Sequence, residues 1–191
     1  MPPDLLKGDA MSARMRTKDF IADTFEEMLK TQSFNSITVQ GIIQTCGISR
    51  TTFYRHFQDK FELMNWIYKA RIEDILKHNP DFFTWKKVIY ETLQFIQEKN
   101  SYFKNTFSYK NQNALGDFLF ECTRDYWVHH LQREANVNEL PGEIVASIKF
   151  YSAGVIYTLG AWITGGMKEP YEMIAQRMCD NIPKPIGQYL K

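Results

Sequence analysis

The stretch from Thr38 to Phe57 constrains the fold most strongly, because it contains two short helical patterns separated by three residues. The apolar residues of the first pattern recur at the spacing of one helix face, and they are Val39, Ile42, Ile43 and Cys46. Thr38 suits the N-cap of this helix, and Gly47 suits its left-handed end. Ser49 then suits the N-cap of a second helix, from Arg50 to about Phe57. Two short helices joined by a glycine-containing turn predict a helix-turn-helix.

Helical periodicity continues along nearly the whole chain, and alternating strand patterns are scarce. We expect one helix before the helix-turn-helix, over residues 12–31, and a long one after it, over 60–78. Asp59 suits the N-cap of the long helix, with Glu62 completing a capping box. The other expected helices cover 81–100, 101–109, 113–136, 141–164 and 170–181. The fold class is therefore all-α.

Asn79-Pro80 predicts the end of the long helix, because a residue before proline disfavours the helical region. The predicted organisation is an N-terminal helix-turn-helix unit, 1–58, a connecting helix, 59–78, and a C-terminal helical domain, 79–191.

Composition is typical of a globular protein, with 44% hydrophobic and 24% charged residues among 191 and a net charge of +1. The three cysteines lie far apart without a zinc-binding spacing, which favours free thiols in a reducing compartment. The N-terminal residues carry charges throughout and do not resemble a secretory signal. The uncharged run 150–167 contains serine, threonine and glycine. We expect it to be a buried helix rather than a membrane span, and we expect a cytoplasmic protein.

The second helix of the helix-turn-helix has two distinct faces. Phe53 and Phe57, together with Ile48, are expected to pack on the preceding helices. The remaining side chains are expected on the outer surface, and they are Arg50, Thr51, Thr52, Tyr54, Arg55 and His56. Arginine can bind guanine through two hydrogen bonds, and threonine methyl groups can contact thymine. Residues 30–60 include four basic side chains and one acidic one, which favours a local phosphate-binding surface.

The tract ITVQGIIQTCGISRTTFYRHFQDKFELM, residues 37–64, resembles the DNA-binding signature of TetR-family transcriptional regulators. An amphipathic short helix is followed in order by the patterns G-[IV]-S, T-x-Y-x-[HY]-F and D-K-x-x-L. The resemblance implies a homodimer that binds double-stranded DNA at a near-palindromic operator, with the second helix of the motif in the major groove. Carried over by position, the base-facing candidates are Arg50, Thr51 and Thr52. The phosphate-facing candidates are Thr38, Tyr54, His56 and Lys60.

Gly41 departs from the family's pattern, in which an acidic residue is common three positions after the cap. Glycine removes the reciprocal half of a capping box and costs about 1 kcal/mol of helix stability. We therefore expect this helix to fray until DNA binds.

The C-terminal domain is rich in aromatic residues, which predicts either an apolar effector pocket or a packed helical core. The candidate pocket residues are Tyr102, Phe103, Phe118, Cys122, Tyr126 and Tyr151. In TetR-like proteins the last two helices form a four-helix dimer interface, so the resemblance places dimerisation on the expected helices 141–164 and 170–181. The interface candidates are Ser147, Gly154, Tyr157 and Ala161. Packing of the same helix within one chain is the alternative.

The segment GVIYTLGAWITGGMKEPYEMIAQRM, residues 154–178, also resembles a C-terminal module of a TetR subgroup that includes activators of dihydroxyacetone kinase operons. In that branch a protein partner can supply the signal. The expected partners are therefore DNA, a second copy of the chain, and either a small-molecule effector or a protein. Repression is the commoner mode in the family, so we expect a repressor, with activation as the alternative.

Motifs of catalysis and cofactor binding are missing from the sequence, including G-x-S-x-G, the P-loop, G-x-G-x-x-G and H-E-x-x-H. His129 and His130 are neighbours that point about 100° apart on a helix, so we expect surface residues rather than metal ligands. We expect no enzyme activity, no cofactor and no metal. Two other classes stay open. One is a small-molecule binding module with a vestigial DNA-binding unit, for which Gly41 is the only hint, and the other is a helical enzyme.

Overall fold

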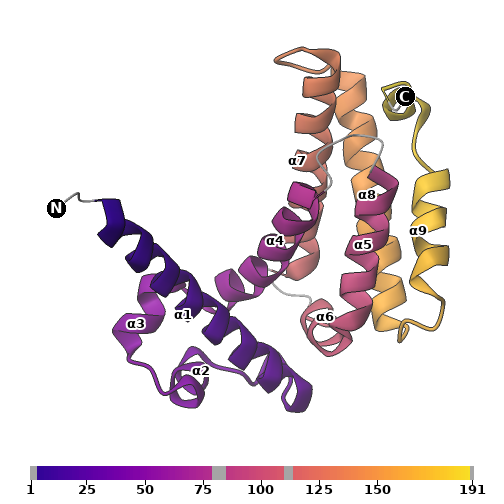
Figure 1. The fold of residues 1–191 in the computed structure, drawn as a ribbon. Helices are drawn as coiled ribbons and strands as arrows, with labels where there is room; N and C mark the ends of the chain where they lie inside the picture. The colour runs from indigo at the N-terminus through magenta and orange to yellow at the C-terminus, as the bar shows by residue number, and fades with distance from the viewer. Residues whose placement is uncertain (1–3, 79–84, 110–113, 190–191) are drawn as a thin grey trace. The chain divides into compact units, whose positions relative to one another are not determined.

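The computed structural model describes residues 4–78, 85–109 and 114–189, and it confirms the all-α prediction. Within these ranges the regular structure is helical and contains no strand (Figure 1). The chain divides into two compact units, Met1–Tyr68 and Lys69–Lys191. The division falls inside one long helix, α4 (Lys60–His78). The functional division at residues 58 and 78 stays a prediction.

The N-terminal unit contains α1 (Asp4–Thr31), α2 (Val39–Cys46), α3 (Arg50–His56) and the beginning of α4. The two helices of the helix-turn-helix and the long helix lie where the sequence predicts them. The first helix begins at Asp4, well before the predicted residue 12. The sequence signal was weak there, because 4–14 shows no regular apolar face.

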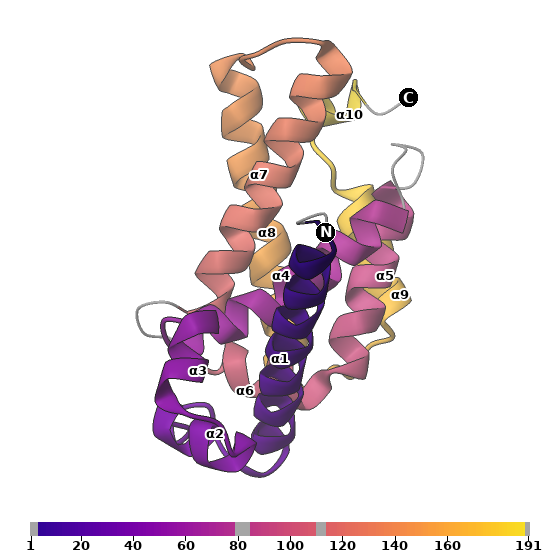
Figure 2. The same ribbon diagram turned by 60° about the vertical axis from the view of Figure 1, so that its left-hand side comes forward.

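Each of these four helices contributes to one apolar core. α1 packs against α2, and α2 packs against α3 (Figure 2). Side chains with almost no exposed surface come from every helix, and they include Ile21, Phe25, Ile42, Phe53, Leu63 and Met64. The rings of Phe57, just after α3, and Trp66 of α4 meet edge to face with centroids 5.7 Å apart. The end of α3 is thereby attached to α4.

Asp59 caps α4 as predicted, but the capping box closes at a different residue. Asp59 Oδ1 accepts hydrogen bonds from the backbone N–H groups of Phe61 and Glu62, both at 2.8 Å. The Glu62 carboxylate accepts from the N–H of Gln58 at 2.5 Å, one residue before the N–H that a standard capping box uses. The first turn of α4 is therefore joined to the chain that leaves α3.

The C-terminal unit contains the end of α4 and six further helices, within the part of the chain that the structure describes. They are α5 (Trp85–Glu98), α6 (Asn100–Phe107), α7 (Leu115–Ala135), α8 (Gly142–Thr164), α9 (Tyr171–Asp180) and α10 (Lys184–Gly187). The sequence predicted five of these helices and missed α10, a single turn that follows Pro183. Residues 81–84 and 113, which we assigned to helices, lie outside the described residues.

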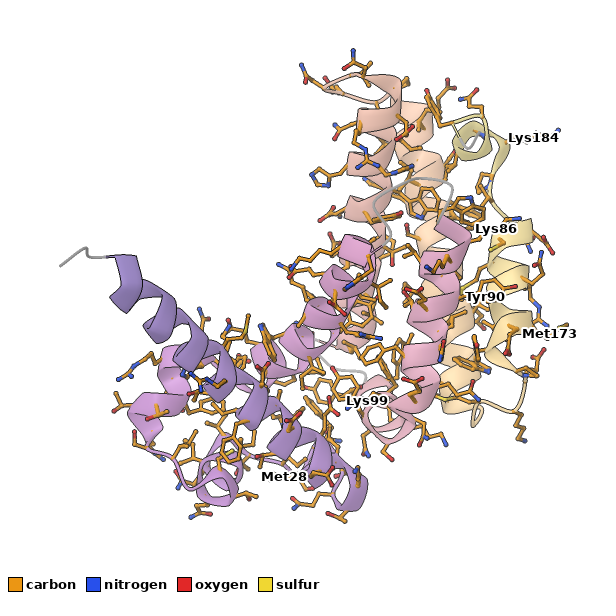
Figure 3. The ribbon with its side chains drawn as sticks, viewed as in Figure 1. Met28, Lys86, Tyr90, Lys99, Met173 and Lys184 are labelled. Carbon is orange, nitrogen blue, oxygen red and sulfur yellow. The ribbon has the colours of Figure 1, made fainter. Side chains whose placement is uncertain are left out.

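Two helix pairs organise the C-terminal unit. α7 lies alongside α8, and α5 packs against α9 (Figure 1). The hydroxyl of Tyr90 on α5 donates to Gln176 Oε1 on α9 at 3.3 Å, and Tyr90 points from α5 toward that helix (Figure 3). A core cluster joins the second half of α7, the first half of α8 and α10. It contains Trp127, Leu131, Ile144, Ile148, Tyr151 and Ile186.

The neighbouring histidines of α7 differ in environment, which corrects the prediction that both lie on the surface. His129 is exposed, but His130 is buried beside the rings of Tyr126 and Trp127. Position 130 follows Trp127 by three residues and therefore lies on the same helix face as that buried ring. Burial lowers the pKa of His130, so its imidazole is neutral near pH 7.

α8 is, among the described residues, the one helix long and apolar enough to cross a membrane by length and composition. It packs within the C-terminal unit through a buried face that includes Ile144, Ile148, Leu159 and Ile163. The prediction of a core helix is correct for this face. The opposite face is exposed, with Phe150 and Tyr157 the most exposed large apolar side chains of the described chain at 83% and 81%.

Tyr151→Phe is expected to lower the free energy of unfolding by about 1–3 kcal/mol. The buried Tyr151 hydroxyl donates to the Met178 backbone carbonyl at 2.7 Å, and phenylalanine would leave that carbonyl without its donor. Tyr54→Phe is the control, because Tyr54 is 54% exposed and lies outside α8, and it should leave stability nearly unchanged. Urea denaturation of both variants measures the difference. Equal stabilities would contradict a buried, structural bond.

Candidate nucleic-acid interface

Hydrogen bonds at three helix ends shape the helix-turn-helix. Thr38 Oγ1 accepts from the N–H of Gly41 at 3.0 Å, which caps α2. Gly47 has a left-handed conformation, with φ of 65°, that ends α2 at little steric cost. Ser49 Oγ accepts from the N–H of Thr52 at 3.0 Å and caps α3. The predicted caps and turn are therefore confirmed. The Thr38 side chain caps α2 although Gly41 has no acidic side chain to return a hydrogen bond.

The outer surface of α3 carries several of the predicted DNA-binding residues. Arg50, Thr51 and Tyr54 are exposed, and Tyr54 has 54% of its surface accessible. Thr52 is half-buried, and its hydroxyl shares a hydrogen bond with Ser49 Oγ at 2.8 Å. Because this hydroxyl is already hydrogen-bonded, the methyl group of Thr52 is the part better suited to contact a base. Their DNA contacts stay a prediction.

His56 is buried, with 8% of its surface exposed, which corrects its predicted place on the outer surface. The reason is its helical position. His56 follows Phe53 by three residues, so both residues lie on the face that packs against the rest of the unit. The 3.6-residue period contained this signal, but the polar side chain suggested exposure instead.

Lys60 is directed into the protein rather than out to solvent. Its Nζ donates to the backbone carbonyls of Phe34 at 2.8 Å and Ile37 at 2.7 Å. It also lies 4.4 Å from the centroid of the Phe34 ring, within cation–π range. Partial burial lowers the pKa of the ammonium group. Lys60 therefore joins the start of α4 to the segment between α1 and α2, a structural role that the predicted phosphate contact did not include.

Gln40 is a surface residue that sequence reasoning missed. Its Oε1 accepts two hydrogen bonds from the guanidinium of Arg50, from Nε at 3.1 Å and from Nη2 at 2.9 Å. The residues are ten positions apart on different helices, and no periodic pattern relates them. Only the folded turn brings them together.

The electrostatic character of this surface follows from its composition. The sequences of α2 and α3 are VQGIIQTC and RTTFYRH, which contain two arginines and no acidic residue. Arginine, threonine and tyrosine are side chains that donate to phosphates and to base edges. The arrangement is therefore suited to an anionic, hydrogen-bonding partner such as DNA.

The candidate effector residues in the C-terminal unit are all buried or half-buried, and their role as an effector pocket stays a prediction. Tyr102, Phe103 and Tyr151 are buried in the helical core. Phe118, Cys122 and Tyr126 are half-buried, and burial raises the pKa of both the thiol and the phenol. An open groove of about 610 Å³ lies elsewhere, between α7 and α8, and its lining includes the interface candidates Tyr157 and Ala161.

The candidate interface residues lie along one side of α8. Gly154, Tyr157 and Ala161 are exposed, and exposed Phe150 extends the same row. A Cβ atom added at Gly154 would have open space around it. Ser147 is half-buried, and its hydroxyl donates to the Glu143 carbonyl at 2.9 Å. Whether this side contacts a second chain stays a prediction.

No group of three or more His, Cys, Asp or Glu side chains within the described ranges is placed to hold a metal ion.

The capped helix-turn-helix and the helical C-terminal unit define a DNA-binding regulator, and comparisons with known proteins identify its family. A family model described as "Bacterial regulatory proteins, tetR family" matches residues 21–66. A second, described as "Transcriptional regulator C-terminal region", matches residues 84–184, more than half of the chain. The chain belongs to the TetR family of transcriptional regulators.

A curated relative supports the same placement. The HTH-type dhaKLM operon transcriptional activator DhaS of Lactococcus lactis subsp. lactis (strain IL1403) is 28% identical over 97 residues. The match covers 51% of this chain and 52% of the relative, so it spans about half the length of each protein.

Two solved structures share the fold. A structure titled "Dihydroxyacetone kinase operon activator DhaS" has a TM-score of 0.66 at 19% identity, with 92% of this chain and 98% of that chain covered. A TetR transcriptional regulator from Streptococcus agalactiae 2603V has a TM-score of 0.53 at 14% identity, with 98% of this chain and 100% of that chain covered.

Lys60→Met is expected to lower the free energy of unfolding by about 1–3 kcal/mol, because the carbonyls of Phe34 and Ile37 lose their charged donor. Lys30→Met is the control in the same unit, since Lys30 makes only an exposed pair with Glu27 and should change stability by less than about 1 kcal/mol. Urea denaturation compares the two. An equal effect of both substitutions would contradict a structural role for the Lys60 ammonium.

Proposed function

We propose that this TetR-family regulator acts as a homodimer that binds a near-palindromic DNA operator through α3 in the major groove. The observation that carries the proposal is the exposed row Arg50, Thr51 and Tyr54 on a capped helix, in a helix-turn-helix whose two helices have no acidic residue. Such a surface binds phosphates without repulsion and presents base-reading side chains. Arg50, Thr51 and Thr52 face the bases, and Thr38 and Tyr54 face the phosphates. His56 and Lys60 act mainly by holding the structure of the unit.

The exposed side of α8 supports the homodimer. Large exposed apolar side chains in a row are typical of a protein interface, and Phe150 and Tyr157 fit this description. The small residues Gly154 and Ala161 between and beyond them permit a close approach of a second helix. A two-fold dimer presents two α3 helices to half-sites about one DNA turn apart.

α4 is the element that would carry a signal between the units. It is one continuous helix whose beginning belongs to the DNA-binding unit and whose end belongs to the C-terminal unit. A small molecule or a protein bound to the C-terminal unit would tilt α4 and change the distance between the two recognition helices. Coupling of this kind is typically worth about 1–3 kcal/mol. The proposed location is the cytoplasm, and no enzymatic role is proposed.

We propose repression as the regulatory mode, because it is the commoner mode in the TetR family. Activation is the second candidate, and the similarity to a protein named as an operon activator favours it. A reporter gene placed behind the selected operator distinguishes them, since a repressor lowers expression and an activator raises it.

Selection of random DNA duplexes on the purified protein tests the central proposal. A palindromic winner, bound by a dimer with an affinity that falls steeply with salt, is the expected result. Failure to enrich any sequence above random DNA would refute sequence-specific binding by the protein alone.

Arg50→Ala is expected to weaken binding to the selected operator by about 1–3 kcal/mol and to relax the preference at one base position. The reason is that an arginine bound to guanine discriminates against other bases, whereas a phosphate contact does not. Repeating the selection with the variant measures the preference directly. An unchanged sequence preference, with weaker binding to all duplexes, would place Arg50 on a phosphate.

Gly154→Asp is expected to produce monomers and weak operator binding, because it places a charge in the apolar row of α8 without a clash inside the chain. Gly142→Asp is the matched control at the first residue of the same helix, where space is also open and the helix dipole favours an acid. Sedimentation velocity measures the oligomeric state. A Gly154→Asp dimer would locate the interface on another surface.

A further inference from the structure

Gln40 and Arg50 form a bridge at the surface of the helix-turn-helix. Gln40 lies on the first turn of α2, and Arg50 is the first residue of α3. Both are exposed, and two hydrogen bonds, of 3.1 and 2.9 Å, join the Gln40 side-chain oxygen to Nε and Nη2 of Arg50. The contact therefore fixes an arginine at the start of the helix proposed to enter the major groove.

The geometry of the guanidinium determines which of its donor edges Gln40 occupies and which one it leaves available. The group is planar and has two edges that can donate two hydrogen bonds each, one formed by Nε and Nη2 and the other by Nη1 and Nη2. Gln40 accepts along the first edge. The second edge consequently points away from Gln40. It has the paired donors that bind guanine O6 and N7.

We infer that Gln40 is a positioning residue for base recognition, which holds Arg50 so that its Nη1–Nη2 edge is presented to a guanine. The inference rests on the proposed function, because it assumes that Arg50 contacts a base. Arginine has a long side chain with many rotamers, and a partner that selects one of them reduces the ordering that DNA binding requires.

A neutral acceptor suits this role better than an acidic one. Glutamate at position 40 would hold the guanidinium more strongly, because a charge-assisted hydrogen bond is stronger than a neutral one. It would also cancel the charge of Arg50 and repel the phosphate backbone. Glutamine orients the arginine and leaves its positive charge available to DNA.

A double-mutant cycle tests the inference, with wild type, Gln40→Ala, Arg50→Ala and the double variant. Binding is measured on the selected operator and on the same duplex with one base pair replaced, namely the pair whose preference disappears in Arg50→Ala. Gln40→Ala should weaken binding to the selected operator about tenfold, the scale of one hydrogen bond to a charged group, and should weaken binding to the replaced duplex little. In the Arg50→Ala background it should cause no further loss.

Two more variants sharpen the cycle. Gln44→Ala, at another exposed glutamine of α2, should bind like the wild type. Gln40→Glu keeps the acceptor, so it should retain the guanine preference while its affinity for every duplex falls. Circular dichroism confirms that each variant is folded.

The alternative roles give different results. If Gln40→Ala causes the same loss with and without Arg50, then Gln40 contacts DNA itself and the positioning role is wrong. A loss of the guanine preference in Gln40→Glu would also overturn it. If the wild type enriches no sequence, the proposed function fails first and the inference fails with it. Sequence-specific binding by the wild type with an unchanged preference in Gln40→Ala overturns the inference alone.

Discussion

The seven residues of α3 cannot form a stable helix alone, because nucleation of so short a segment is unfavourable in water. Its position depends on the burial of Phe53, which has no exposed surface, against the other helices of the N-terminal unit. The Ser49 cap fixes where the helix begins, and the left-handed Gly47 fixes how the chain approaches it from α2. A recognition surface on such a helix is only as well ordered as this packing. The buried residues of this unit therefore determine where the exposed residues of α3 lie.

The sequence predicted the backbone of this unit well because its signals are local. A cap, a glycine turn and an apolar period act over fewer than eight residues, and all of these were correctly read between Thr38 and Asp59. Side-chain environment was harder to predict. His56 was placed by residue type, although its spacing from Phe53 indicated the buried face. Lys60 was placed by its charge, but its flexible chain bends toward carbonyls 23 and 26 positions earlier in the sequence. Contacts of that range follow from tertiary structure, and no local pattern encodes them.

The C-terminal unit shows a different limit, because one helix can serve two interfaces. α8 is apolar nearly all round, so its composition is compatible with a membrane span, a fully buried helix or a two-sided helix. The structure separates the faces, with Ile148 and Ile163 buried and Phe150 and Tyr157 exposed. The use of the aromatic side chains in this unit is hard to predict for a related reason. Aromatic side chains fill cores as readily as they line pockets, and only the tertiary arrangement of α6, α7 and α8 distinguishes the two uses.

Only part of the basic charge in the DNA-binding unit is available to DNA, because some of the basic side chains already have partners within the protein. Of the four basic residues between 30 and 60, Lys30 pairs with Glu27, and Lys60 donates to two backbone carbonyls. Arg50 is held by a neutral glutamine, so its charge is uncompensated by that contact. Counterion release depends on the phosphates that a protein neutralises, not on the number of its basic residues. At the start of α3 the available positive charge belongs to one oriented arginine, whose free donor edge can discriminate between bases as well as attract phosphates.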